Sequence, residues 1–208
     1  YYEFNLNNFV MKYAENMAFK VQLVKSLLKV LKDLHFMGFH HGNLKSFNVL
    51  INYSETETNS FQIGLSDARK YRKLSQLINN ISSSDKKKLR FVYIPPERFE
   101  KNDEFQFNEK ADIWGLGIMI FEIFYGDTEL YQMTIPWCDE DPEDINIENV
   151  RQMIHKGKNK KNEFCAKSSS ILPDITEAIN SCLQINAENR ISVANLLGKF
   201  NRIEMLIP

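Results

Sequence analysis

Cysteine is scarce in this chain, and the few cysteines are far apart. The 208 residues contain three, and none belongs to a C-x-x-C pair. That spacing indicates neither a disulfide framework nor a zinc site. We therefore expect an intracellular, cytoplasmic location. The three residues are Cys138, Cys165 and Cys182.

Long apolar runs and an excess of charge of one sign are also absent. No apolar run approaches the roughly 18 residues that a membrane-spanning helix needs, and no signal-peptide pattern stands at the start. A net charge of -1 argues against nucleic acid and anionic membranes as partners. Since the first residue is not Met, we expect the chain to be an excerpt of a longer protein.

Apolar material is plentiful by contrast. Hydrophobic residues make up 43% of the chain, with 15 Phe among them, which is enough to fill a core. At this length we expect one domain. Trp114 and Cys182 are interpreted as members of that core, and the lysines at 86–88 and 156–161 as solvated surface.

Two stretches have the patterns of long helices. From Glu15, apolar residues recur at three- and four-residue steps over about 20 residues, and Gly38 follows as a stop. Residues 110–125 are apolar nearly all round, which predicts a central buried helix that ends at Gly126. Residues 1–13 show no helical stripe.

The end of the chain, residues 174–200, is predicted to form two more helices. The first covers 174–185 and starts after Pro173. The second covers 192–200, with Ser192 as its N-cap.

Between the two long helices, the sequence predicts a β-hairpin with an unusual loop over residues 39–67. Residues 49–51 predict one strand, and Phe61, Ile63 and Leu65 alternate as the returning strand after a polar loop at 52–60. Residues 39–48, at the mouth of the hairpin, are too polar for a core and too regular for a linker. They are typical of a functional loop held by a rigid scaffold.

A long segment without apolar periodicity follows at 68–95. Loops of about 28 residues are uncommon in compact domains and are usually functional or mobile. Two interpretations stay open: a functional segment, or a solvated loop. Pro95, Pro96 and Glu97 close it.

Four motifs in a fixed order make the chain resemble the C-terminal lobe of a protein kinase, over essentially all 208 residues. They are L-H-x-x-G-x-x-H-G-N-L-K-x-x-N at 34–48, P-P-E at 95–97, D-x-W-x-x-G at 112–117 and C-L-x-x-x-x-x-N-R-I at 182–191. The H-G-N-L-K-S-x-N form is most similar to the tyrosine-kinase-like and plant receptor-kinase-like group, including inactive members.

The resemblance implies a mainly α fold with a small β-hairpin: the large C-terminal lobe only, with the N-terminal lobe absent from this chain. Residues 1–13 would be the hinge-like start, 39–67 the catalytic-loop hairpin and 68–97 the activation segment. No G-x-G-x-x-G or V-A-I-K motif, which the N-terminal lobe would carry, occurs in the chain.

The resemblance also assigns structural roles to four residues. We call residues 39–48 the signature loop; Asp112 would accept hydrogen bonds from its backbone at His41. Glu97 and Arg190 would form a buried ion pair. His40 and His41 are interpreted as a packing pair and not as metal ligands, since no Cys or carboxylate cluster accompanies them in sequence.

The catalytic positions are only partly kept. Asn43 stands where the family has the aspartate that accepts the substrate proton, and an amide has no basicity near neutral pH. Gly42 replaces the arginine that grips a phosphorylated activation loop. Lys45 and Asn48 match the phosphate and metal side of the family's site, and Lys45 is the serine/threonine-type form.

The metal-binding aspartate of the D-F-G motif has two candidate registers. In one, Asp67 is the aspartate and Ala68 and Arg69 replace Phe and Gly; in the other, Leu65 takes its position and the aspartate is lost. Strand alternation fits both, because the shift is even. The Ser66-Asp67 match favours Asp67.

Taken together, the resemblance implies a pseudokinase: a protein-binding scaffold or allosteric regulator in signalling, with protein partners that include an active kinase. Two alternatives remain, a weak or atypical serine/threonine kinase and a non-catalytic nucleotide-binding switch. No cofactor is predicted for the chain alone; ATP and magnesium are expected if the upstream lobe is present. The oligomeric state stays open.

Overall fold

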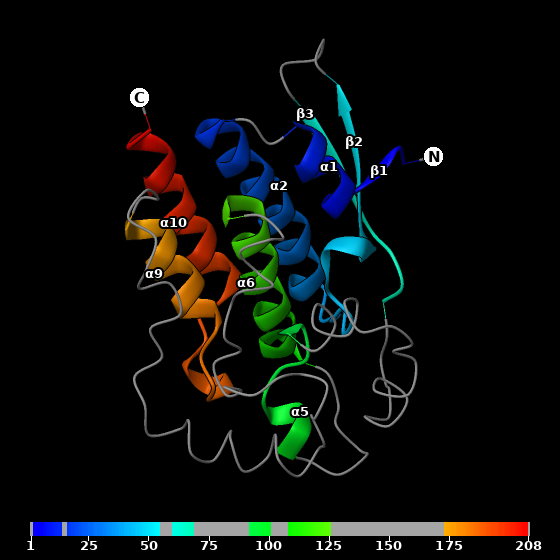
Figure 1. The fold of residues 1–208 in the computed structure, drawn as a ribbon. Helices are drawn as coiled ribbons and strands as arrows, with labels where there is room; N and C mark the ends of the chain where they lie inside the picture. The colour runs from blue at the N-terminus through cyan, green and yellow to red at the C-terminus, as the bar shows by residue number, and fades with distance from the viewer. Residues whose placement is uncertain are drawn as a thin grey trace, which may run out of the picture.

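The structure is a computed structural model that describes residues 2–13, 16–54, 60–68, 92–100, 108–125 and 173–207. In these ranges, helices pack beside one small antiparallel sheet (Figure 1). Most of the predicted 68–95 segment, Gly126, Cys138, Cys165 and the lysines at 86–88 and 156–161 lie outside the described residues. The predicted mainly α fold with a small β-hairpin is confirmed for the described part.

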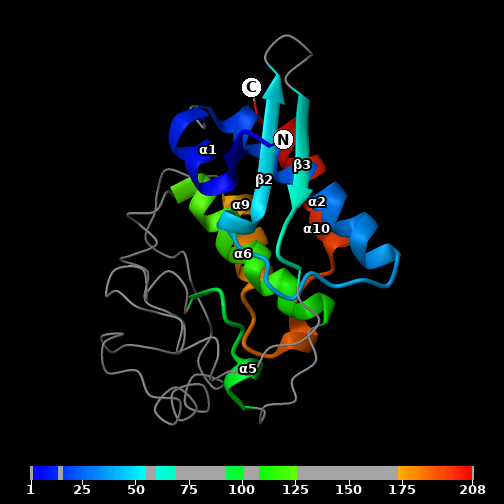
Figure 2. The same ribbon diagram turned by 90° about the vertical axis from the view of Figure 1, so that its right-hand side faces the viewer.

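The hairpin is present, and the sheet has one more strand than predicted. Strands β2 (Val49–Ser54) and β3 (Ser60–Leu65) are antiparallel, with Val49 opposite Leu65. The short β1 (Phe4–Asn5) pairs with the other edge of β2. Both views place the open end of the hairpin toward helix α6 (Figure 1, Figure 2).

Residues 1–13, which show no helical stripe in the sequence, nevertheless contain a helix, α1 (Leu6–Tyr13). Three asparagines and the absence of a long stripe hide it in the sequence, but Leu6 and Phe9 are fully buried. The Phe9 ring lies 5.7–6.1 Å from the rings of four other aromatic residues. Tertiary packing therefore stabilises this helix more than its local pattern does. The four partners are Phe4, Phe19, Tyr53 and Phe61.

The two long helices form the centre. Helix α2 spans Met17–Phe36; the Asn16 side chain caps it by accepting a hydrogen bond from Phe19 N, and Gly38 follows with φ +76°. Helix α6 spans Glu109–Tyr125, and every residue from 111 to 124 is buried. Both predictions are confirmed.

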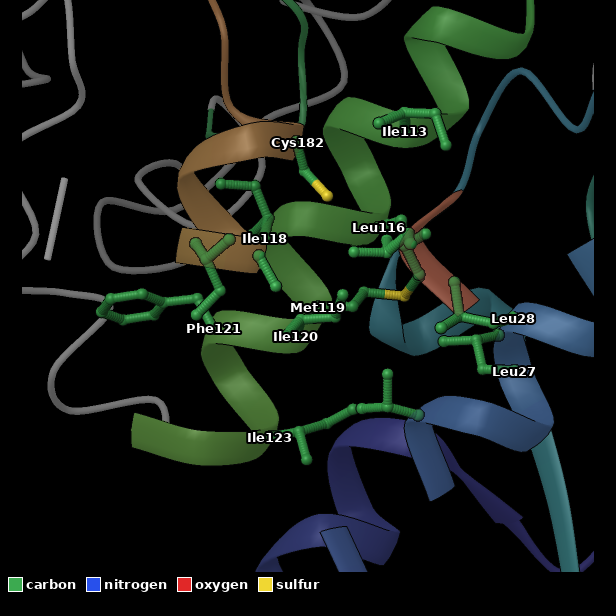
Figure 3. Close-up of a cluster of buried hydrophobic side chains, with 14 of the residues drawn as sticks. Leu27, Leu28, Ile113, Leu116, Ile118, Met119, Ile120, Phe121, Ile123 and Cys182 are labelled. Atoms are coloured by element: carbon green, nitrogen blue, oxygen red, sulfur yellow. The ribbon is translucent and has the colours of Figure 1, made fainter. Parts of the chain in front are cut away.

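Helix α6 touches the other helices through apolar side chains. Figure 3 shows Leu27 and Leu28 of α2 beside Met119 of α6, with Cys182 of α9 in the same cluster. Burial raises the pKa of the Cys182 thiol to about 12, so that thiol is a core group, as the sequence indicates.

The terminal helices differ from the prediction in their lengths. Helix α9 covers Pro173–Cys182 and ends before 185, because the chain turns there and Ile191 N bonds to Ser181 O. Helix α10 covers Val193–Met205, past the predicted end at 200, and its extra turns bury Ile203. The N-cap is confirmed: Asn195 N donates to Ser192 Oγ at 3.3 Å. The short α5 (Glu97–Glu100) was not predicted.

Among the described residues, none of the helices combines the length and apolarity needed to cross a membrane.

Two glycines of α6 allow close contacts that a side chain would block. A Cβ at Gly115 would lie 2.5 Å from the backbone oxygen of Leu44, in the signature loop. A Cβ at Gly117 would lie 2.6 Å from Cys182 Cβ on α9. Helix α6 therefore sits directly against both the signature loop and α9.

The close contact between Gly115 and the Leu44 backbone predicts that an alanine at position 115 destabilises the protein, unlike an alanine at a glycine with open space around it. Gly115→Ala should lower the free energy of unfolding by about 1–3 kcal/mol, since the backbone of Leu44 must move. Gly198→Ala is the matched control: it lies in α10 with nothing within 4 Å of the added Cβ, and should stabilise by about 0.5–1 kcal/mol. Urea unfolding measures both. A Gly115→Ala protein as stable as the wild type would contradict the contact.

Candidate functional site

The signature loop is anchored by the carboxylate of Asp112, in the first turns of α6. His41 N donates to Asp112 Oδ2 at 2.7 Å, and Gly42 N donates to Oδ1 at 2.8 Å. The Nε2 atom of His35, at the end of α2, lies 3.0 Å from Oδ2. Asp112 is 1% exposed, so these are buried, charge-assisted contacts. The predicted His41 contact is present; those of Gly42 and His35 were not predicted.

Gly42 suits this position because of its backbone. Its φ of +68° lies in the left-handed region, where glycine carries no Cβ penalty. This conformation lets consecutive backbone N–H groups, at positions 41 and 42, reach the two oxygens of one carboxylate.

The buried imidazole of His41 connects the loop to the end of β3. Its Nε2 lies 3.0 Å from Ser66 O, and its Nδ1 accepts from Asn43 N at 3.3 Å. Burial lowers the pKa of His41 and outweighs the nearby Asp112 charge, which raises it. The lowered pKa favours the neutral ring. A neutral ring with Nδ1 as acceptor carries its proton on Nε2 and donates to Ser66 O.

The predicted pairing of His40 with His41 is only half right. His41 is packed inside, whereas His40 is exposed and its ring lies 5.8 Å from that of His35. No group of three or more metal-ligating side chains occurs among the described residues.

Three of the predicted site residues converge at the mouth of the hairpin. Asn43 Nδ2 donates to Asp67 Oδ2 at 2.8 Å and also lies 3.3 Å from Asp67 O. Asn48 Nδ2 donates to Asn43 O at 2.8 Å. Lys45, half-buried, lies in the same loop, where its carbonyl accepts from Asn48 N at 2.9 Å.

The strand register brings Asp67, and not Leu65, to this site. Leu65 is the last residue of β3 and stands opposite Val49 inside the ladder. Ser66 N then bonds to Asn48 O at 2.9 Å, and Asp67 follows with φ +57°, beyond the ladder. Arg69, which replaces the glycine of the D-F-G motif, lies outside the described residues.

Asp67 and Asn48 are the side chains at this position that would hold a magnesium ion. Mg²⁺ is usually held by one or two carboxylates together with substrate phosphates. Asp67 Oδ2 already accepts the Asn43 amide. Asn48 donates its side-chain N–H to Asn43 O, so its amide oxygen is the atom that would bind the metal.

Glu97 and Arg190, predicted to pair, do so through two parallel hydrogen bonds. Arg190 Nη1 donates to Glu97 Oε1 at 2.8 Å, and Nη2 donates to Oε2 at 2.6 Å. The guanidinium also donates to Lys110 O and Gln184 O, and it lies 5.0 Å from the Trp114 ring. The pair thus joins α5 to the turn before α10 and to α6.

A buried polar cluster of Ser46, Tyr93 and Glu122 was not predicted. The Tyr93 hydroxyl donates to Glu122 Oε2 and lies 3.3 Å from Ser46 Oγ. Burial, helped by the Glu122 charge, raises the pKa of Tyr93 well above its ordinary value, so the hydroxyl keeps its proton. One signal was available: Glu122 is the single charged residue within 113–124, and a buried carboxylate needs a partner.

Comparison with known proteins supports the kinase-like arrangement of these elements. A sequence model of the protein kinase domain matches residues 5–200. The chain belongs to the protein kinase family. The fold is therefore that of a kinase domain, and the resemblance drawn from the four motifs is confirmed at this level.

Several curated kinases are similar to the chain. The serine/threonine-protein kinase SKM1 of Saccharomyces cerevisiae is 25% identical over 84% of the chain and 23% of its own length. Mitogen-activated protein kinase kinase kinase 1 of Arabidopsis thaliana is 27% identical over 84% and 24%. Eukaryotic translation initiation factor 2-alpha kinase 1 of Plasmodium falciparum is 27% identical over 85% and 9%. The chain thus spans a quarter or less of these relatives.

The Glu97–Arg190 pair predicts a large loss of stability on neutralisation. Glu97→Gln leaves the buried guanidinium without its counter-charge and should lower the free energy of unfolding by about 3–5 kcal/mol. The matched control is Glu177→Gln, which removes the ion pair with Lys199 on an exposed surface and should cost less than about 1 kcal/mol. Chemical denaturation compares them, and equal effects would contradict a structural role for Glu97.

Proposed function

We propose that this chain is the C-terminal lobe of a protein kinase-family domain that works by binding other proteins and transfers little or no phosphate. The observation that carries the proposal is the contact from Asn43 Nδ2 to Asp67 Oδ2. The residue at the position of the catalytic base is an amide, and its donor group faces the carboxylate on which the family's metal site depends.

The chemistry of phosphoryl transfer explains why this contact matters. Catalysis consists of positioning plus electrostatic stabilisation of phosphates by metal ions and cationic groups. A general base contributes a further factor of about 10²–10⁴, and an amide supplies none of it. With Asp67 committed to Asn43, both the base and the metal side of the site are altered.

Protein partners fit the parts of the domain that remain. The anchoring contacts of Asp112 and the Glu97–Arg190 pair keep a rigid lobe without requiring catalysis. We infer a scaffold or allosteric regulator of the tyrosine-kinase-like, receptor-kinase-like group, with an active kinase among its partners.

A weak or atypical serine/threonine kinase is the second candidate, and the names of the relatives support it better than they support the first. They include a serine/threonine-protein kinase and mitogen-activated protein kinase kinase kinases. Lys45, Asn48 and Asp67 would be the residues in use. The same three residues motivate a third candidate, a non-catalytic nucleotide-binding switch.

Phosphate transfer by the whole protein, upstream lobe included, tests the first candidate. With labelled ATP, magnesium and generic protein substrates, we expect transfer no faster than that of an Asn48→Ala variant, because the base is missing. Reproducible transfer that Asn48→Ala abolishes would overturn the proposal.

Two further arms separate the alternatives. If the protein is a weak kinase, Asn43→Asp should raise the rate by orders of magnitude, since it restores the base. If it is a nucleotide switch, ATP with magnesium at 100 times the dissociation constant should stabilise it by about 2.7 kcal/mol, seen as a thermal shift.

A further inference from the structure

We propose that two copies of this chain pair with each other through a groove between α9 and the end of α10. The groove has a volume of about 370 Å³ and extends to Leu206, the C-cap of α10. Figure 1 shows the start of α9 beside the end of α10, so both helices reach the groove. The proposal goes beyond the proposed function and does not rest on it, because pairing requires neither the presence nor the absence of phosphate transfer.

The two walls of the groove carry opposite charges. Helix α9 contributes Asp174 and Glu177, and helix α10 contributes Lys199 and Arg202. One acid and one base are already paired within the chain, since Lys199 Nζ lies 2.6 Å from Glu177 Oε1. Asp174 and Arg202 are exposed and form no ion pair with any described residue. The groove therefore offers one carboxylate and one guanidinium to a partner.

Apolar side chains at the end of α10 lie beside these charges. Ile203 is 2% exposed and forms an apolar floor, whereas Met205 is 83% exposed and Leu206 is 60% exposed. Neighbouring exposed apolar side chains that are rimmed by polar residues mark an interaction surface. Met205 and Leu206 thus form an apolar edge that a partner would cover.

A second copy of the chain is the partner that this pattern fits. A face with only one sign of charge would repel its own copy, but a face with both signs is complementary to itself. Around a two-fold axis through the groove, every contact occurs twice with the roles exchanged. Asp174 of each copy then faces Arg202 of the other, and the apolar edge of each copy covers the Ile203 floor of the other.

The size of the face predicts a weak, reversible dimer. A stable protein–protein interface buries about 1,600 Å² in total, and smaller interfaces belong to weak or transient contacts. A face made of the ends of two helices belongs to the smaller class. Since exposed charges are screened by salt, we expect the dimer to weaken as the ionic strength rises.

Sedimentation of the whole protein, upstream lobe included, over a concentration series tests the pairing. The wild type should pass from monomer to dimer. Asp174→Arg and Arg202→Asp should each weaken the dimer at least about tenfold, because each places like charges opposite one another at two symmetric contacts. Glu188→Arg is the matched control: this exposed residue of η3 (Ala187–Asn189) does not line the groove, and its charge reversal should leave the dimer unchanged.

A mixture of the two weakened variants is the sharpest part of the test. The Asp174→Arg chain keeps its own Arg202, and the Arg202→Asp chain keeps its own Asp174. In a mixed dimer the two substituted positions meet as opposite charges, and the two native residues meet each other. The mixture should therefore form a heterodimer about as tight as the wild-type dimer, although neither variant pairs well with itself.

A charge-neutral variant tests the apolar half of the face. Met205→Ser combined with Leu206→Ser should also weaken the dimer at least about tenfold, because it removes the apolar edge. Phe36→Ser is its matched control. Phe36 is 90% exposed at the end of α2, outside the groove, and its replacement should not change the dimer.

Three outcomes would overturn the proposal: a wild type that stays monomeric up to about 0.5 mM, charge-reversal variants that dimerise as tightly as the wild type, or a mixture that forms no heterodimer. If a charge reversal prevents folding, Asp174→Asn and Arg202→Gln replace it. Each should weaken the dimer by a smaller factor, and unchanged dimers would count against the pairing. None of these measurements uses phosphate transfer, so the pairing and the proposed function can fail separately.

Discussion

The structure depends on the buried carboxylate of Asp112. It stands in the first turns of α6, the buried helix that packs against α2 and α9. It accepts two backbone N–H groups of the signature loop and faces the imidazole of His35 on α2. A buried carboxylate is tolerated only when such donors surround it. The requirement runs both ways: the loop must come close enough to satisfy Asp112, and Gly115 leaves the space for its backbone to do so.

This anchoring explains how the loop can keep its shape while its chemistry changes. Asp112 holds His41 and Gly42 through their backbone N–H groups, so the contact does not depend on the side chain of the next residue, Asn43. Asn43 can therefore replace the family's aspartate without disturbing the scaffold, and its amide turns to Asp67. Membership of the protein kinase family thus describes the scaffold, whereas activity depends on the side chains at its mouth.

Periodicity and motif order were enough to predict α2, α6, the hairpin and the Glu97–Arg190 pair, because each is either long and regular or carried by a family motif. The failures have local physical causes. Helix α1 is short and forms because Phe9 packs among four rings, and β1 has meaning only as a partner of β2. Strand alternation cannot distinguish a shift of two residues, so only the Ser66-Asp67 match favoured Asp67 over Leu65, and the Val49–Leu65 pairing is what places Asp67 beyond the end of the strand. The hydrogen bond between Asn43 and Asp67 joins residues 24 apart and depends on that pairing.

The central claim is that the scaffold of the kinase site is intact while Asn43 holds the carboxylate that a metal would use. Crystal structures of the whole protein, grown with EDTA and with saturating magnesium and ATP, test it most directly. The account predicts Asn43 Nδ2 within hydrogen-bonding distance of Asp67 Oδ2 in both. A magnesium ion bound between Asp67 and Asn48, with the Asn43 side chain turned away, would contradict it.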